Sequence, residues 1–98
     1  MHMEDKKKEE STHKALFRSW MRAALTRYMA VVSPEVFMDV YAMNLYLHAE
    51  LCAELEKKRR AKRNYKKALR VYQRLEKKYP GEYESDIEEI QEYLSEMA

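Results

Sequence analysis

Residues 33–55 read SPEVFMDVYAMNLYLHAELCAEL, and the fold class follows from them. Ser33 can cap a helix, Pro34 suits the first turn because no partner awaits its missing N–H, and Glu35 meets the positive end of the helix dipole. Apolar side chains then recur at helical spacing along one predicted seam: Val36, Val40, Met43, Leu47, Leu51 and Leu55. Five more apolar side chains widen this surface: Phe37, Tyr41, Leu45, Tyr46 and Cys52. We therefore expect a helix covered on most sides, either by other helices of the chain or by a second subunit.

The sequence on both sides of this stretch has helical periodicity too. Residues 12–32 carry a predicted apolar face made of Leu16, Phe17, Trp20, Met21, Ala24, Leu25, Tyr28 and Met29. Pro80-Gly81 is a stop signal, and Ser85 with Glu88 three residues later is typical of a capping box. The sequence predicts helices over 12–32, 34–60, 64–79 and 85–97, with a bend between Arg59 and Asn64. The alternative is one unbroken helix over 35–79, which requires an elongated oligomer.

The composition favours long helices over sheets. The chain has one glycine and two prolines, and sheets need more residues suited to tight turns. Hydrophobic residues make up 46% of the chain, enough for a modest core despite 37% charged residues. We predict an all-α protein: a small helical bundle of three to four amphipathic helices with a disordered N-terminal tail. The tail is the charged segment 1–10, and residues 11–98 form a single domain.

The sequence also carries signs of the protein's environment. No apolar run approaches the roughly 20 residues that a membrane-spanning helix needs, and the start has no apolar secretion signal. Cys52 is the only cysteine, so no disulfide can form within the chain. We expect a soluble cytoplasmic protein with no membrane partner. Two Asn and two Gln beside 36 charged residues are typical of thermophilic proteins, whereas seven methionines argue against that origin.

Charge is strongly segregated along the second half of the chain. Residues 57–78 hold twelve bases and one acid, a net charge of +11, whereas residues 82–98 hold seven acids and no base. We expect the acidic last helix to fold back across Pro80-Gly81 and to neutralise part of the basic helix. Seven acids cannot cover twelve bases, so unpaired basic charge should remain.

The favoured functional hypothesis is binding to the backbone of DNA or RNA, without strong sequence specificity, because Lys and Arg displace counterions from phosphates. The predicted nucleic-acid-binding residues are Lys57, Lys58, Arg59, Arg60, Lys62, Arg63, Lys66, Lys67 and Arg70. A secondary basic face comprises Lys14, Arg18 and Arg22. Tyr65, Tyr72 and Tyr79 recur every seven residues among these bases, and that spacing favours packing on the last helix over stacking on bases.

The alternative hypothesis is a protein–protein interaction module, an adaptor or small inhibitor with no nucleic-acid role. Surface charge should discriminate the two. A continuous positive groove uniting the secondary basic face with residues 57–63 favours nucleic acid, and a mixed-charge surface with exposed Phe or Tyr favours a protein partner. In either case we predict a homodimer whose interface includes Phe37, Tyr41, Leu45 and Tyr46.

No catalytic constellation is evident, and we expect neither an enzyme nor a bound cofactor. His48 and Cys52 are four residues apart, a spacing at which two side chains can share a zinc ion. Because two ligands do not make a metal site and no second pair follows, we interpret both residues as packing residues. There is also no glycine-rich phosphate loop, since the chain has a single glycine.

Overall fold

The computed structural model describes the backbone of residues 2–97 and the side chains of residues 12–97. The helices are α1 (His2–Val32), α2 (Pro34–Glu54), α3 (Lys58–Lys78) and α4 (Glu84–Glu96). The described backbone contains no strand, so the all-α prediction is confirmed. The disordered tail predicted for residues 1–10 falls on residues whose side chains lie outside that description. No helix in the described part is long and apolar enough to cross a membrane.

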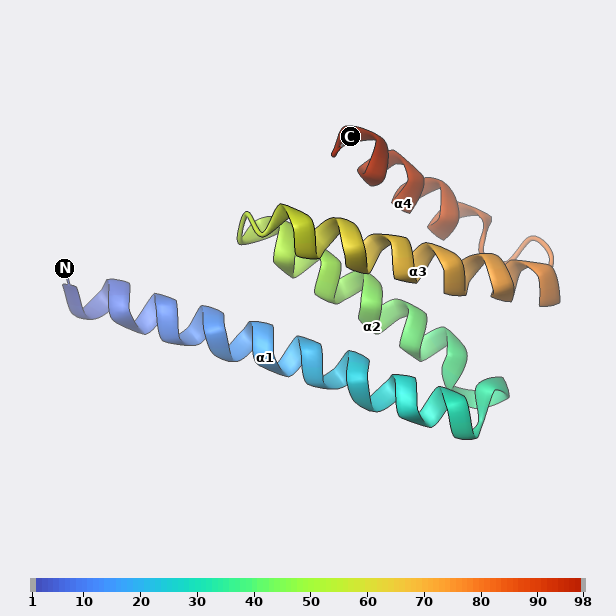
Figure 1. Ribbon diagram of the computed structural model, residues 1–98, viewed down its shortest axis with the longest axis horizontal. Coiled ribbons are helices and arrows are strands. Elements are labelled where there is room, and N and C mark those ends of the chain that lie inside the picture. The colour runs from blue at the N-terminus through green and yellow to red at the C-terminus, as the bar shows by residue number, and fades with distance from the viewer. Residues whose placement is uncertain (1, 98) are drawn as a thin grey trace.

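Successive helices run antiparallel and pack on their neighbours in the sequence (Figure 1). Within the described residues, α1 contacts α2, α2 contacts α3, and α3 contacts α4. The helices α1 and α3 therefore both pack on α2, while no Cα atom of one comes within 8 Å of a Cα atom of the other. The principal-axis extents of 51 × 32 × 18 Å reflect this flattened arrangement, with α2 as its centre.

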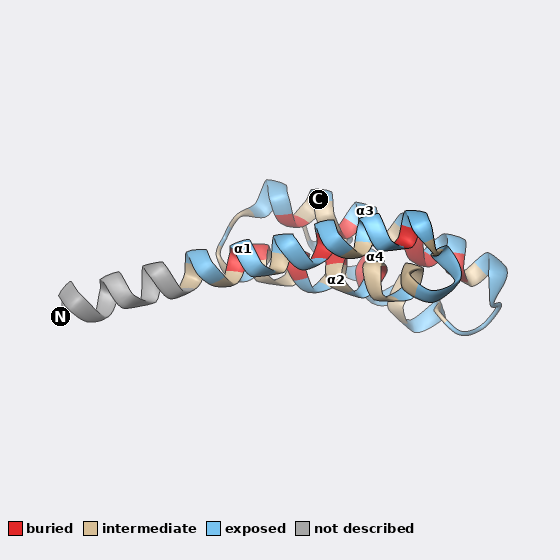
Figure 2. Cartoon of the chain, turned by 90° about the horizontal axis from the view of Figure 1, so that it is seen from below, coloured by how far each residue is buried: buried red, intermediate tan, exposed pale blue. Residues whose placement is uncertain are grey.

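Alanines make up six of the fifteen buried residues. Fully buried alanines lie on both α2 and α3, and α1 contributes Ala23 and Ala30 to the buried set. The buried residues are Leu16, Ala23, Ala30, Ala42, Leu45, His48, Ala49, Cys52, Ala61, Tyr65, Ala68, Val71, Tyr72, Leu75 and Ile90. Figure 2 shows α1 mostly in the exposed and intermediate colours, with short buried segments. The helices therefore pack partly through alanines. A search for regularly spaced large apolar side chains in the sequence does not find these residues.

The predicted apolar face of α1 was largely wrong, and that of α2 was partly wrong. Of the face predicted for residues 12–32, only Leu16 is buried, while Phe17, Leu25 and Tyr28 are more than half exposed.

On α2 the predicted seam is divided. Val36, Met43 and Leu47 are exposed, whereas Leu51 and Leu55 are half-buried and pack against the core.

The chain breaks between α2 and α3 a few residues before the predicted bend. Glu56 has φ = 59°, in the left-handed region. Its N–H donates to the carbonyl of Ala53 (3.0 Å), and the N–H of Lys57 donates to the carbonyl of Cys52 (2.8 Å). This pair of bonds is a Schellman motif, which ends α2. The bend predicted at Arg59–Asn64 was therefore misplaced, and the unbroken helix over 35–79 is excluded.

The turn before α4 depends on one carboxylate. The Glu76 side chain accepts hydrogen bonds from the N–H of Gly81 (2.9 Å) and of Tyr83 (3.0 Å). Gly81 has φ = 91°, a conformation that favours glycine. The residue before the first helical position of α4 is Tyr83, so the capping box predicted at Ser85 was wrong, although the helix starts within one residue of its predicted position.

The left-handed conformation at Glu56 leads to a stability prediction. Because a Cβ is strained there and glycine is not, we expect Glu56→Gly to raise the free energy of unfolding by about 1 kcal/mol. Urea denaturation followed by circular dichroism measures the change. Glu56→Ala is the matched control, since it removes the same carboxylate and keeps the Cβ. A gain equal in both variants would refute backbone strain as the cause.

Candidate functional site

A groove lies between α1 and α3, with α2 as its floor. Two adjoining cavities of about 780 and 370 Å³ share four lining residues, and together they form this groove. The shared residues are Trp20, His48, Asn64 and Lys67. We call it the α1–α3 groove. It exists because α1 and α3 each pack on α2 while their backbones stay apart.

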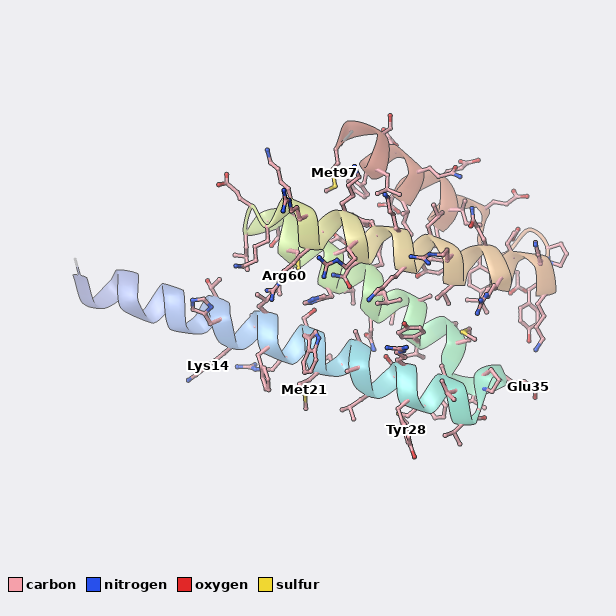
Figure 3. All side chains as sticks on the ribbon, in the orientation of Figure 1. Lys14, Met21, Tyr28, Glu35, Arg60 and Met97 are labelled. Carbon is pink, nitrogen blue, oxygen red and sulfur yellow. The ribbon has the colours of Figure 1, made fainter. Side chains whose placement is uncertain are left out.

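The α3 wall of the groove is a row of bases. Five exposed residues, spaced alternately three and four apart, line it: Arg60, Arg63, Lys67, Arg70 and Arg74. This spacing keeps them on one face of a helix. Figure 3 shows Arg60 extending from α3 toward α1. On the opposite wall Arg27 adds a sixth base, and no acidic residue is among those lining either cavity.

The α1 wall and the floor are largely apolar. Phe17, Trp20 and Val31 line the wall and remain 60%, 53% and 77% exposed, respectively. The floor from α2 includes Met38 and Tyr41. A groove with one basic and one apolar wall suits an amphipathic ligand of negative charge. The sequence did not predict that apolar residues of α1, Arg27 and Arg74 line a common groove. The regular spacing of the bases on α3 could have indicated Arg74.

The predicted nucleic-acid-binding residues divide between the groove and the rest of α3. Arg60, Arg63, Lys67 and Arg70 line the groove. The other five predicted residues do not line it: Lys57, Lys58, Arg59, Lys62 and Lys66. Lys58, Arg59 and Lys66 are exposed, whereas Lys57 and Lys62 are half-buried. Exposed basic charge therefore runs along α3, partly inside and partly outside the groove.

The secondary basic face does not join the bases of α3. Lys14, Arg18 and Arg22 are exposed, and none of them lines the groove. Lys14 points away from α2 and α3, as do Met21 and Tyr28 on the same outer side of α1 (Figure 3). The structure thus does not bring these bases together with residues 57–63 into one positive groove.

The predicted dimer-interface residues pack mainly within the chain. Leu45 is 4% exposed and belongs to the core, so its assignment to a surface was wrong. Phe37, Tyr41 and Tyr46 are half-buried. Exposed apolar side chains lie instead on the outer side of α1 and on the face of α2 that carries Met43 and Leu47. Self-association stays a prediction, and these exposed residues are now its better candidates.

Two of the three heptad-spaced tyrosines pack against α4 and its turn. Tyr65 stacks on Tyr93 with ring centroids 5.4 Å apart, and Tyr72 lies 5.8 Å from Tyr83. Glu89 of α4 accepts a hydrogen bond of 2.8 Å from the hydroxyl of Tyr46. Burial raises the pKa of Tyr65 to about 12, with nearby carboxylates adding to the effect. Because Tyr65 and Tyr72 are buried, they are not available to stack on nucleic-acid bases.

A polar cluster lies at the α1–α2 contact, where His48 also lines the groove. His48 Nδ1 is 3.0 Å from Ser19 Oγ, and His48 Nε2 is 3.8 Å from Cys52 Sγ. Burial raises the pKa of the Cys52 thiol, which keeps it protonated and a poor nucleophile. The described residues contain no group of three or more His, Cys, Asp or Glu side chains able to hold a metal ion. His48 and Cys52 are both buried, as their interpretation as packing residues predicts.

His48 makes the stability of the fold dependent on pH. Burial, together with repulsion by Arg60, lowers the pKa of His48 below its usual 6.5. Between that lowered pKa and 6.5 the unfolded chain binds more protons than the folded one, so stability is lost as pH falls through this window. We expect the melting temperature to fall between pH 7.5 and 5.5, and to fall less in His48→Gln. Differential scanning fluorimetry at both pH values measures this, and an equal fall in both proteins would contradict the assignment.

Known proteins offer no guide to the role of this groove. Comparison with protein-family models found no match, and comparisons with curated proteins and with solved structures found no similar protein. The chemistry of the lining residues is therefore the basis for any functional interpretation.

Proposed function

We propose that this protein is a non-catalytic interaction module, an adaptor that binds a segment of another protein in the α1–α3 groove. The observation that carries the proposal is the outward placement of large apolar side chains on α1. Phe17, Trp20 and Val31 stand more than half exposed along one wall of a groove. Exposed aromatic and aliphatic side chains that line a concave surface are typical of a protein-binding site.

Charge placement supports a protein partner over nucleic acid. Binding to the backbone of a duplex rests on phosphate contacts, to which an apolar wall contributes nothing. The secondary basic face is separated from the groove, and Tyr65 and Tyr72 are buried in the core. A protein segment, by contrast, can use both the apolar wall and the basic wall of the groove.

Site-specific photo-crosslinking in cells that naturally contain the protein tests the proposal. Benzoylphenylalanine at position 24, where exposed Ala24 lines the groove, should give a discrete protein adduct that survives nuclease treatment. The same group at position 22, exposed on α1 but outside the groove, is the matched control. Equal adducts at both positions, or adducts that consist of nucleic acid, would refute the groove as a protein-binding site.

Nucleic-acid binding is the second candidate, and the exposed bases of α3 favour it. Exposed Lys and Arg side chains follow this helix from Lys58 to Lys78. The arginines among them can make bidentate contacts to phosphates, and the lysines add point charges. This surface extends beyond the groove, so backbone binding could use the outer side of α3 without the apolar wall.

The second candidate predicts a steep dependence on salt. If six to ten phosphates are contacted, affinity for mixed-sequence DNA or RNA should fall by about 10³ to 10⁵ between 50 and 200 mM salt. Combined Arg59→Glu, Arg60→Glu and Arg63→Glu substitutions should abolish binding, as measured by fluorescence anisotropy. Combined Arg18→Glu and Arg22→Glu substitutions are the control on α1. No binding by the unaltered protein at 50 mM salt would eliminate this candidate.

A further inference from the structure

We infer that the partner segment is an acidic amphipathic helix, which lies lengthwise in the α1–α3 groove with its apolar side against α1 and its acids along α3. The inference rests on the proposed function and names the chemistry of the partner. It combines the sign of the charge in the groove, the polarity of its two walls, and the way α3 already binds α4.

The charge in the groove selects an acidic partner. Six bases and no acids are among the residues that line the two cavities. Five of the bases form the row on α3, so they repel one another as well as any basic ligand. An acidic segment relieves this repulsion, whereas a neutral segment leaves it unchanged.

The spacing of the bases selects a helix. The α3 row runs from Arg60 to Arg74, about 21 Å at 1.5 Å per residue. Acids that recur three and four residues apart on a neighbouring helix can meet such a row along its whole length. The apolar groups of the opposite wall, including Phe17 and Trp20, then face the other side of the same helix. This is the helix-in-groove mode of recognition, with charge setting the orientation.

The packing of α4 shows that α3 accepts an amphipathic helix on its other flank, through apolar and tyrosine contacts. α4 is an acidic amphipathic helix that packs on α3 within the same chain. Its Ile90 is fully buried, while its acids at positions 84, 88 and 92 are exposed. α4 spans 13 residues, close to the length that the basic row can accommodate. Because α4 is not among the elements that line the groove, the groove side of α3 remains open to a second helix of this kind.

The α4 sequence supplies a probe for the experiment. A synthetic peptide of residues 82–97 carries seven acids and the apolar residues of α4. Its control replaces every Glu by Gln and every Asp by Asn, which keeps the apolar face and removes the charge. Trp20 is the only tryptophan of the protein and lines both cavities of the groove, so its emission reports binding there. The peptides contain no tryptophan and do not interfere.

The acidic peptide should shift the Trp20 emission to shorter wavelength, with an affinity that weakens as salt rises. Combined Lys67→Gln and Arg70→Gln substitutions should weaken binding about tenfold, because two ion pairs are lost. Combined Arg18→Gln and Arg22→Gln substitutions remove the same charge outside the groove and should leave the affinity unchanged. If the peptide binds in the groove, amide chemical shifts should change in α1 and α3 and stay the same in α4. If the peptide instead replaced α4, the shifts of α4 would change.

Each contrary result overturns a different statement. Equal binding of the acidic and neutral peptides would refute the acidic partner and leave the groove as a protein-binding site. Shifts confined to α3 and α4, with no change at Trp20, would show replacement of α4 and refute groove binding by such a helix. A Trp20 response to single-stranded DNA and to neither peptide would refute both the inference and the proposed function.

Discussion

Close contact through small side chains is the constraint on which the rest of this structure depends. Ala42 and Ala49 on α2, with Ala61 and Ala68 on α3, are fully buried, and Ala23 and Ala30 bring α1 against α2. Helix backbones can approach closely where only alanines lie between them. On α1, Leu16 is the one large apolar side chain of residues 12–32 that is buried, and the others stay exposed.

The position of α2 between two helices whose backbones stay apart explains the groove. α1 and α3 both pack on α2, and the side chains that each of them points toward the other line the groove. On α1 these are mainly apolar side chains, and on α3 they are bases. The two walls differ in charge because the two helices differ in composition. Residues 57–78 hold twelve bases and a single acid, so the positive charge of α3 is not neutralised within that helix. The groove therefore has one apolar wall and one basic wall.

α3 serves as the platform of the molecule, with a different role on each flank. Toward α4 it presents tyrosines, which stack on Tyr93 and Tyr83 and are supported by the hydrogen bond from Tyr46 to Glu89. Toward the groove it presents a row of bases that no acid of the lining neutralises. Bases also crowd its N-terminus, where the helix dipole disfavours positive charge. Positive charge at this end of the helix therefore opposes helix formation there.

The sequence by itself determined the all-α class, the approximate helices, the separation of charge and the packing role of Tyr65 and Tyr72. These features depend on local signals, namely scarce glycine, helical periodicity and the Ser33-Pro34 and Pro80-Gly81 boundaries. The inward faces of α1 and α2 were decided only by the tertiary structure, because periodicity counts apolar residues and does not reveal that alanines make the closest contacts. The turn at Glu56 was hidden as well, since a non-glycine residue in the left-handed region carries no signal in the sequence. The groove itself requires α1 and α3, which α2 separates along the chain, to flank α2, and only the packing of the three helices brings them there.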